Sequence, residues 1–549
     1  MPSLRCLRCA VFFVLAGLGG ALAFSPGFAG SASAPPPSQT VIQAVNSGVE
    51  LERSRKWLDA FQHYEKAAKS WPDSKELEIG LRRSKFHYYI ERRYTDGSFR
   101  KSLLPMTRQE AMSLLDQVLS YLESTYVEAV HPMSFVAHGT ESFYLALGDD
   151  RFLDANTNPR LRGNAEAVRE ILKGKQFWNK PVSNREEAHA LIDRICQLSG
   201  EQLGIKPAAV ILEYVFGGCN VLDDYSAFLT PGRLHDLHSN IDGQFVGLGV
   251  EVRAEAGQGL LLVHVLPESP ASEAGLQSGE HIVNIDGVDV RQMTTDESAS
   301  RLQGTEGSRV VLEVQKSNGG SVRRVSVTRR AVVVKSVPVA KIVDRDQGIG
   351  YIQMTSFQKS TVEEFDAALQ TLRQQGMRSL IWDLRGNPGG LLTTAVEVLD
   401  RFIGDGVLVS GRGRIANRNF SYSAHRPGTW NIPLVLLIDG DSASASEIVA
   451  GAVKDHHRGT IVGRKSFGKW SVQEIHNIPT ARGMCGLRMT TAKFYSPHGH
   501  TLGKIGLHPD IEVPESEAQR TTSRGPADLE QDADVQKARE VLQRQMARR

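Results

Sequence analysis

The run from Pro433 to Ala452 constrains the fold of this chain more than any other segment. It opens with the apolar residues Pro433–Ile438, passes through the turn Asp441–Glu447 (Asp-Ser-Ala-Ser-Ala-Ser-Glu), and becomes apolar again at Ile448–Ala450. A short apolar run bounded by turn residues is typical of a buried strand, and a Ser-rich turn before an apolar run is typical of a helix start. The order predicts strand, turn and helix in a β/α core, with Ser444 at the helix N-terminus, where the dipole favours negative charge.

A lysine follows this turn in the segment Ser466–Gln473 (Ser-Phe-Gly-Lys-Trp-Ser-Val-Gln). Serine at its ordinary pKa is a poor nucleophile and needs a neighbouring group that takes its proton. Lysine serves as that base only when desolvation lowers its pKa towards neutrality. Ser444 and Lys469 are therefore candidates for a nucleophile and its base.

Three segments together resemble the carboxyl-terminal processing peptidases, which use a Ser/Lys dyad in place of a Ser/His/Asp triad. These segments are Asp383–Leu391 (Asp-Leu-Arg-Gly-Asn-Pro-Gly-Gly-Leu), Ser442–Ala452 and Phe467–Gln473. The resemblance implies that Ser444 is the nucleophile and Lys469 the general base. It also implies that Gln473 orients the lysine.

The same resemblance implies that the backbone N–H groups of Gly390 and Ala445 form the oxyanion hole. Such a site needs N–H donors and a glycine where the scissile carbonyl comes close to the backbone. The chemistry requires no cofactor, and no Cys/His spacing indicates a metal site.

Other residues near the motif offer alternatives. Ser442 and Ser446 flank Ser444, but only Ser444 matches the family position with an alanine after it. His456 and His457 suggest a His-based triad, although cationic groups also favour the last turn of a helix. Each motif taken alone is as consistent with a flexible loop or an ordinary turn.

The residue after the lysine departs from the family pattern, because Trp470 stands where glycine is usual. Its indole either helps to desolvate Lys469 or crowds the substrate channel. The main prediction is an active serine endopeptidase. The alternatives are a catalytically inactive PDZ-containing scaffold and a ligand-binding protein on the same fold.

Residues 239–332 resemble a PDZ domain. The matching stretches are Gly247–Val250, Ser269–Leu276 and Gly279–Gly287. In PDZ domains a peptide adds as a strand to a sheet edge, and its terminal carboxylate is held by backbone N–H groups. Leu248, Gly249 and Val250 would supply these groups, and the resemblance implies that peptide binding gates the active site. The alternative is a tight strand connection.

The region before the PDZ domain is predicted to be helical. Within 40–100, one tetratricopeptide-like repeat is indicated by Gly48, Ala60, Tyr64, Ala67 and Pro72. A single repeat cannot bury its apolar face, so it either packs on the following helices or docks an adaptor. Residues 101–238 form a helical domain, with one apolar face at Ala111, Leu114, Leu115, Val118, Leu119 and Leu122. The segment Leu222–Pro231 resembles the stretch before the PDZ domain in this family, and its role is structural.

The N-terminus has the pattern of a secretory signal. Arg5 and Arg8 precede the apolar run Ala10–Leu22, and Ala21–Ala23 matches a small-residue cleavage site. We expect a signal peptide at 1–23, a linker at 24–39 and a soluble protein in the periplasm or outside the cell. The alternative is membrane association through an uncleaved signal.

Composition excludes some classes of function. With 64 Lys and Arg against 62 Asp and Glu, the formal charge of +2 gives no reason to expect nucleic-acid binding. Peptides or proteins with accessible C-termini are the expected partners, and homo-oligomerisation stays open. Cys196, Cys219 and Cys485 would remain after signal removal, and export permits a disulfide between the first two.

At 549 residues the chain exceeds one module, so we predict a multidomain α+β protein. A helical N-terminal region and a PDZ domain precede a β/α serine peptidase core at 333–515. The polar tail at 516–549 forms a surface helix or stays disordered.

Overall fold

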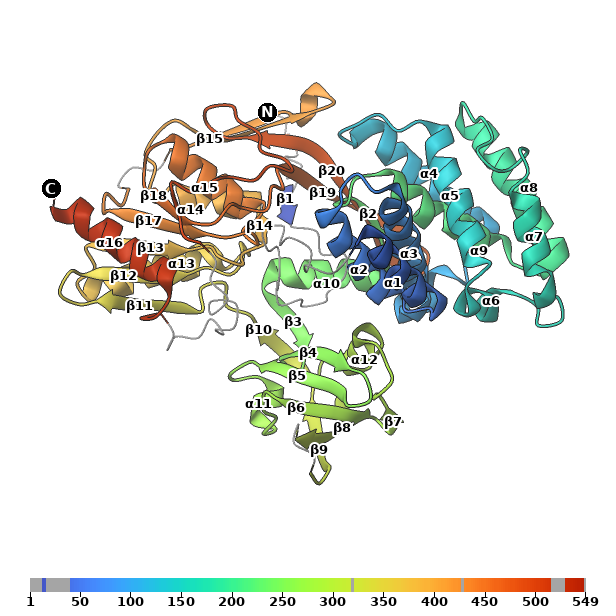
Figure 1. Ribbon diagram of the computed structural model, residues 1–549, viewed down its shortest axis with the longest axis horizontal. Helices are drawn as coiled ribbons and strands as arrows, with labels where there is room; N and C mark the ends of the chain where they lie inside the picture. The colour runs from blue at the N-terminus through green and yellow to red at the C-terminus, as the bar shows by residue number, and fades with distance from the viewer. Residues whose placement is uncertain (1–11, 16–39, 317–319, 426–428, 515–528, 548–549) are drawn as a thin grey trace, which may run out of the picture.

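The computed structural model describes residues 12–15, 40–316, 320–425, 429–514 and 529–547. A helical region, a small β-domain and a larger α/β region lie side by side (Figure 1). This arrangement matches the predicted multidomain α+β class. The predicted signal and linker at 1–39 lie outside the described residues except for strand β1 (Phe12–Leu15).

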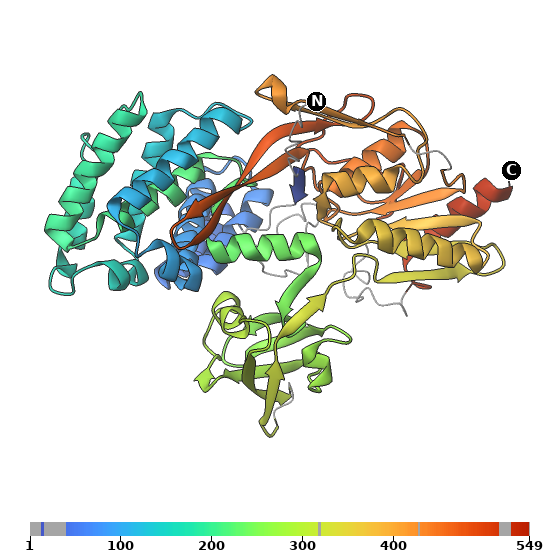
Figure 2. The same ribbon diagram turned by 180° about the vertical axis from the view of Figure 1, so that it is seen from behind.

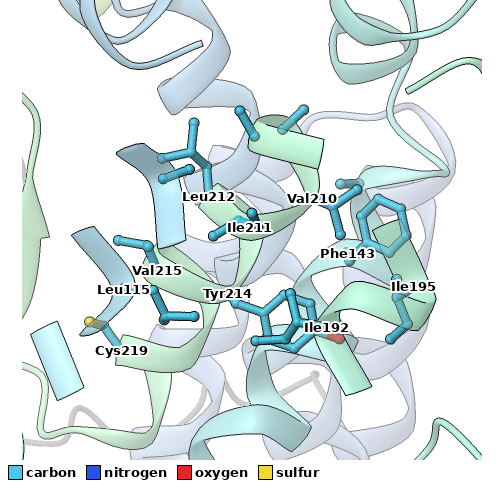
Figure 3. Close-up of a cluster of buried hydrophobic side chains, with 14 of the residues drawn as sticks. Leu115, Phe143, Ile192, Ile195, Val210, Ile211, Leu212, Tyr214, Val215 and Cys219 are labelled. Carbon is cyan, nitrogen blue, oxygen red and sulfur yellow. The ribbon is translucent and has the colours of Figure 1, made fainter. Parts of the chain in front are cut away.

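The helical region runs to residue 221. Its elements are α1 (Val41–Arg53), α2 (Trp57–Ser70), α3 (Lys75–Thr95), the π-helix η1 (Phe99–Leu103), α4 (Arg108–Thr125), α5 (Pro132–Ala146), α6 (Asp150–Asn156), η2 (Arg162–Asn164), α7 (Ala165–Leu172), α8 (Arg185–Leu203), α9 (Pro207–Gly218) and η3 (Cys219–Val221). Thr107 starts α4 through a capping box with Glu110. Helix α9 is buried on nearly all sides, and the apolar side chains around it form the core of this region (Figure 3).

The tetratricopeptide-like segment packs on the helix that follows it. Tyr64 is buried between α1 and α3, where a Cβ at Gly48 would lie 2.2 Å from its ring and one at Gly80 2.5 Å. Glycines at these two positions therefore allow the close approach of three helices. Helix α3 covers the face that one repeat would expose. Cys196, Cys219 and Cys485 are buried and free, so the structure contains no disulfide between the first two.

Helix α10 (Pro231–Asp242) leads to the small β-domain. Strand β3 (Gln244–Gly247) pairs with β10 (Arg330–Val333) to form a two-stranded stem. The domain sheet has the order β4-β5-β6-β8-β9, with β7 on β6. Its elements are β4 (Val250–Glu255), β5 (Gly259–Val265), α11 (Pro270–Glu273), β6 (Glu280–Ile285), β7 (Val288–Asp289), α12 (Thr295–Leu302), β8 (Arg309–Lys316) and β9 (Arg323–Thr328). Arg151 of α6 joins Glu297 of α12 at 2.9 Å, which ties this domain to the helical region.

The α/β region is built on a sheet of order β11-β12-β13-β17-β18-β21, in which only β11 is antiparallel. Its elements are β11 (Val339–Asp344), β12 (Ile349–Gln353), α13 (Thr361–Gln374), β13 (Ser379–Asp383), α14 (Leu392–Leu399), β17 (Leu434–Ile438), α15 (Ala445–Asp455), β18 (Thr460–Gly463), β21 (Ile511–Glu512) and α16 (Ala533–Ala547). Leu436 packs with α13, α14 and α15, whereas Val435 and Leu437 pack with α16. Because neighbouring strand residues face opposite sides, both faces of the sheet are covered.

The C-terminal segment, for which the sequence left a surface helix or disorder, contains α16. Its side chains Val535, Ala538 and Leu542 are buried against the sheet. Helix α16 is thus part of the packed α/β region, as its position beside β13 and β12 in Figure 1 shows.

A second sheet connects the α/β region to the helical region. Its order is β14-β1-β19-β20-β15-β16, with β2 on β20. The strands are β2 (Ala227–Leu229), β14 (Gly389–Leu391), β15 (Val407–Gly413), β16 (Phe420–Ser423), β19 (Ser471–Thr480) and β20 (Gly483–Tyr495), and the short helix η4 (Ala416–Arg418) follows β15. The long β19–β20 hairpin reaches the helical region (Figure 2), where Ile478 and Leu487 join the helical core. The segment after Leu222 supplies β2 and so forms one edge of this connection.

Candidate active site

Ser444 occupies the turn between β17 and α15, as the strand, turn and helix order predicted. Its backbone has φ 65° and ψ −113°, an unusual conformation for a residue other than glycine. The two neighbouring serines have hydrogen-bonded hydroxyls: Ser442 donates to Leu384 O at 2.8 Å, and Ser446 donates to Asn387 O at 2.9 Å. The Ser444 hydroxyl is buried and has no hydrogen-bond partner among the described residues. Ser444 is therefore the serine of this turn whose hydroxyl is uncommitted.

Glu447 joins the serine turn to the lysine loop. Its Oε2 accepts from the backbone N–H of Ser444 at 2.8 Å and of Lys469 at 2.8 Å. Its Oε1 accepts from Ser466 Oγ at 2.6 Å and from Gly468 N at 2.7 Å. Because both backbone nitrogens donate to the same oxygen, the distance between them is at most the sum of the two hydrogen-bond lengths. The carboxylate therefore holds Ser444 and Lys469 close to each other.

Lys469 is fully buried, and its Nζ has no hydrogen-bond partner among the described residues. The Nζ lies 4.8 Å from the ring centroid of Tyr225. Burial holds the pKa of Lys469 well below its usual range, and the positive charge of Arg488 adds to this effect. Asp223 and Glu447 oppose the shift because they stabilise the charged ammonium. The environment thus favours a neutral amine.

Gln473 lies on β19, four residues after Lys469. Its Nε2 donates to Ser471 Oγ at 2.9 Å and to Thr490 Oγ1 at 3.1 Å, whereas its buried Oε1 lacks a partner within the described structure. An unpaired polar atom in the interior is costly, so several in one place need a reason. The side-chain amide is therefore oriented with its Oε1 free to accept a hydrogen bond.

Gly390 lies in the short strand β14, at the end of the loop that follows β13. Its φ is 148°, and a Cβ would come 2.1 Å from Phe357 O, so no side chain fits. The loop is fastened to the serine turn because Asn387 O accepts from Ala443 N at 3.1 Å as well as from the Ser446 hydroxyl. Ala445, the other predicted oxyanion residue, is buried at the first position of α15. The structure thus links the Gly390 loop to the start of α15.

The predicted histidine alternatives take no part in this cluster. His456 caps the far end of α15 and its Nε2 contacts Val407 O at 2.7 Å. His457 follows it in the turn after the helix. Leu248, Gly249 and Val250 lie in the small β-domain, apart from the serine and the lysine.

Three residues around the serine turn and the lysine have no role at the site predicted from the sequence. Glu447 was quoted only as the end of a motif, although a glutamate three residues after a serine is the spacing of a capping box. Tyr225 lies in the segment Leu222–Pro231, for which a structural role is predicted, and burial raises its pKa to about 12. Arg488 is buried on β20 and donates from Nε to Tyr225 O at 2.9 Å. No local pattern marked Arg488, because it reaches the site through strand pairing.

Trp470 lies in the core. Its side chain is 3% exposed and stacks on Phe494 with 4.7 Å between ring centroids. A Cβ at Gly451 would lie 3.1 Å from the indole, which shows how closely α15 packs against it. The side chain belongs to the same apolar cluster as Val472 and Leu507. Trp470 therefore fills the interior.

Replacing Trp470 by glycine is expected to lower the free energy of unfolding by about 3–5 kcal/mol, because the indole leaves a cavity beside Phe494. Chemical denaturation of the purified variant measures this change. Trp470→Phe keeps an aromatic ring on Phe494 and should cost less. A glycine variant with full stability and higher activity would instead mean that the indole obstructs the substrate.

Comparison with known proteins identifies the class. Residues 348–513 match peptidase family S41, and residues 263–316 match the PDZ domain. A carboxy-terminal-processing protease of Bartonella bacilliformis is 36% identical over 297 residues, which cover 53% of this chain and 67% of that protein. The carboxyl-terminal-processing protease of Picosynechococcus sp. is 33% identical over 345 residues, covering 62% of this chain and 76% of its own.

Among solved structures, the photosystem II D1 C-terminal processing protease aligns over 73% of this chain and 93% of its own, with 25% identity and a TM-score of 0.38. The sequence matches define a serine-type peptidase with a PDZ domain. The chain belongs to the carboxyl-terminal-processing proteases of family S41, as its three motifs predicted.

Proposed function

We propose that this protein is an exported endopeptidase that holds the C-terminus of its substrate in the PDZ domain and cleaves with Ser444 and Lys469. One observation carries the proposal. The Ser444 hydroxyl and the Lys469 amine are buried without partners among the described residues, while their backbone N–H groups share one oxygen of Glu447. A nucleophile and a desolvated base fixed this closely are the parts of a Ser/Lys dyad.

The reaction follows from these groups. Ser444 Oγ attacks the scissile carbonyl carbon while its proton passes to the neutral amine of Lys469. The N–H groups of Gly390 and Ala445 stabilise the oxyanion. Collapse of the tetrahedral intermediate breaks the C–N bond, and Lys469 returns the proton to the leaving amine. Water then attacks the acyl ester while Lys469 takes its proton. The C–Oγ bond breaks, Lys469 returns that proton to Ser444 Oγ, and the product acid is released.

Gln473 orients the base in this scheme. Its Nε2 is held by Ser471 and Thr490, so its Oε1 is the group available to accept a hydrogen bond from Lys469. That bond would fix the direction of the amine during both proton transfers. Ser444 and Lys469 lack a hydrogen bond to each other in the structure, which fits a site that peptide binding completes.

The second sheet supports an extended substrate. Strand β1 lies between β14 and β19, antiparallel to both, with Val14 opposite Gly390 and Phe13 opposite Gln473. The facing edges of β14 and β19 thus accommodate one strand across the predicted site. A substrate backbone in this position would pass beside the oxyanion residue Gly390.

Two backbone hydrogen bonds orient the peptide planes of the PDZ loop at residues 248–250. Leu248 O accepts from Ala271 N at 2.9 Å, and Gly249 O accepts from Leu266 N at 2.9 Å. In a trans peptide the N–H points opposite to the C=O, so the N–H groups of Gly249 and Val250 point away from these donors. This orientation supports the predicted role of residues 248–250.

Recognition of the C-terminus is tested with paired substrates. An unstructured peptide with an apolar C-terminal residue should be cleaved with a lower KM when its C-terminus is free than when it is amidated. Amidation removes the charge that the loop N–H groups would hold, and a tenfold change corresponds to about 1.4 kcal/mol. Equal KM values for the two peptides would exclude carboxylate recognition.

A pH profile tests the role of Lys469. The neutral amine is the active form, and its pKa is lowered by burial and by Arg488, so kcat/KM should rise through an acid limb well below pH 10.5. Arg488→Gln removes a positive charge, raises the pKa of Lys469 and moves this limb to higher pH. Asp223→Asn removes a negative charge and moves it to lower pH. If neither substitution moves the acid limb, the limb arises from the titration of another group.

Export rests on the N-terminal sequence. Arg5, Arg8 and the following apolar run have the secretory pattern and lie largely outside the described residues. Within the described part of the chain, no helix is long and apolar enough to cross a bilayer. Adaptor binding by the tetratricopeptide-like segment and homo-oligomerisation are further proposals.

A further inference from the structure

We propose that Asp534, on the C-terminal helix α16, is a positioning residue of the active site. Through the buried Arg385 and the half-buried Arg464 it holds the loop that leads to Gly390 and the strand end that leads to Lys469. Asp534 lies outside residues 348–513, which match the peptidase family. The inference rests on the proposed catalytic roles of Gly390 and Lys469.

Arg385 is the first link. It lies in the Gly390 loop and is 7% exposed. Its Nε and Nη2 donate to Asp383, while its Nη1 donates to Asp534 Oδ2 at 2.7 Å and to Asp532 Oδ1 at 3.0 Å. Tyr351 completes the group by donating its hydroxyl to Asp383 at 2.7 Å. The guanidinium therefore has acceptors both on β13 and at the start of α16.

Arg464 is the second link. It follows β18, two residues before Ser466, and its Nη1 and Nη2 donate to the two oxygens of Asp534 at 2.9 Å and 2.6 Å. Such paired hydrogen bonds between a guanidinium and a carboxylate fix geometry as well as energy. The side chain of Asp534 is 4% exposed. One buried carboxylate thus bridges two segments that are far apart in the chain.

Each of these segments continues directly to a predicted catalytic group. From Arg385 the loop runs through Gly386, whose N–H donates to Asp439 Oδ1 at 2.9 Å, and on to Gly390. From Arg464 the chain reaches Ser466, which donates to Glu447 at 2.6 Å, and then Lys469. Asp534 touches neither the substrate nor the reacting atoms. Its effect is on the relative position of the oxyanion loop and the base.

Asp532 supports this arrangement by fixing the start of α16. Its Oδ1 accepts from the backbone N–H of Asp534 at 3.0 Å and of Val535 at 3.2 Å. The apolar side chains of α16 anchor the remaining turns on the sheet. Helix α16 thus has two separable functions: an apolar face that covers the sheet and an acidic N-terminus that holds the two arginines.

The separation of these functions gives the test. In the full chain, Asp534→Asn should lower kcat for peptide cleavage by roughly 10–100-fold while KM changes less than about twofold, because a small displacement of catalytic groups affects the transition state most. Leu542→Ala is the matched control, since it removes apolar packing from the same helix. It should lower Tm but leave kcat per folded molecule unchanged. Asp534→Glu keeps the carboxylate and should recover part of the lost kcat.

The outcomes are distinct. If Asp534→Asn keeps the wild-type kcat, or if Leu542→Ala loses as much kcat, α16 has only a structural role and the inference is overturned. Should Asp534→Asn fail to fold, Arg464→Lys takes its place, because it breaks the paired hydrogen bonds to Asp534 at a side chain that is 24% exposed. Unchanged kcat in that variant also overturns the inference. Absence of cleavage by the wild-type chain would count against the proposed function instead.

Discussion

Replacing Ser444 by alanine is expected to lower kcat for peptide cleavage by roughly 10⁴-fold or more, with little change in KM or stability. The hydroxyl is buried and makes no hydrogen bond within the described structure, so its removal breaks no hydrogen bond of the folded state. The substitution leaves the proposed substrate contacts of the PDZ domain and of the strand position unchanged. Steady-state cleavage of an unstructured peptide with an apolar C-terminus measures the effect.

Lys469→Ala should lower kcat by a similar factor, because nucleophile and base act as one unit and their effects do not add. The double variant should therefore be no slower than either single one. Ser442→Ala and Ser446→Ala provide the controls. Each removes a hydroxyl from the same turn, and each should lose stability through its broken backbone hydrogen bond while retaining most of kcat.

A serine-reactive probe separates the dyad from its alternatives. An activated Ser444 in the wild type should react, and Lys469→Ala should react far more slowly because the unassisted hydroxyl is a weak nucleophile. Labelling that persists at the wild-type rate in Lys469→Ala would show that another group activates the serine. Labelling at Ser442 or Ser446 would reassign the nucleophile.

The sequence predicted the local parts of this site. An apolar run, a small-residue turn and a second apolar run specified β17, the Ser444 turn and α15, because the period and the turn residues act over a few positions. The three motifs together predicted the family, and the family matches confirm it. The sequence did not predict the tertiary contacts between segments that are far apart in the chain.

Helix α16 and Trp470 show why these tertiary contacts were not predicted. The carboxylates of α16 lie about 150 residues from Arg385 in the chain, and their polar surroundings suggested a solvated tail. Val535, Ala538 and Leu542 have the spacing of one helix face, but so few apolar residues do not distinguish a buried helix from a surface helix. Trp470 lies just before β19, and an irregular segment has no period that sets the direction of a side chain. Its position in the core required the packing of α15 and Phe494.

Substitution of Glu447 is expected to have the second large effect on activity and stability. Its two oxygens accept four hydrogen bonds, from Ser444, Ser466, Gly468 and Lys469. Glu447→Gln replaces one oxygen by an NH₂ group, which is itself a donor. With the NH₂ group on the Oε2 side, the N–H groups of Ser444 and Lys469 lose their acceptor. With it on the Oε1 side, the Gly468 N–H loses its acceptor, whereas the Ser466 hydroxyl can turn to accept from the NH₂ group.

The expected result is a loss of roughly 10²-fold in kcat together with about 2–5 kcal/mol of stability, since buried N–H groups left unpaired are costly and the serine turn is no longer tied to the lysine loop. Both are measured on the purified variant, by peptide cleavage and by denaturant unfolding. Burial raises the pKa of Glu447, whereas the four donors favour its charged form.

Ser466→Ala is the matched control, because it removes one donor to Glu447 and leaves the bonds to Ser444 and Lys469 intact. It should lower stability by about 1–3 kcal/mol, because Leu507 N–H also loses the Ser466 hydroxyl as its acceptor, and lower kcat by much less than Glu447→Gln does. If both variants lose stability but keep kcat, the carboxylate is only a structural group. If Glu447→Gln alone loses kcat, the bonds to the two backbone nitrogens are what keep nucleophile and base together.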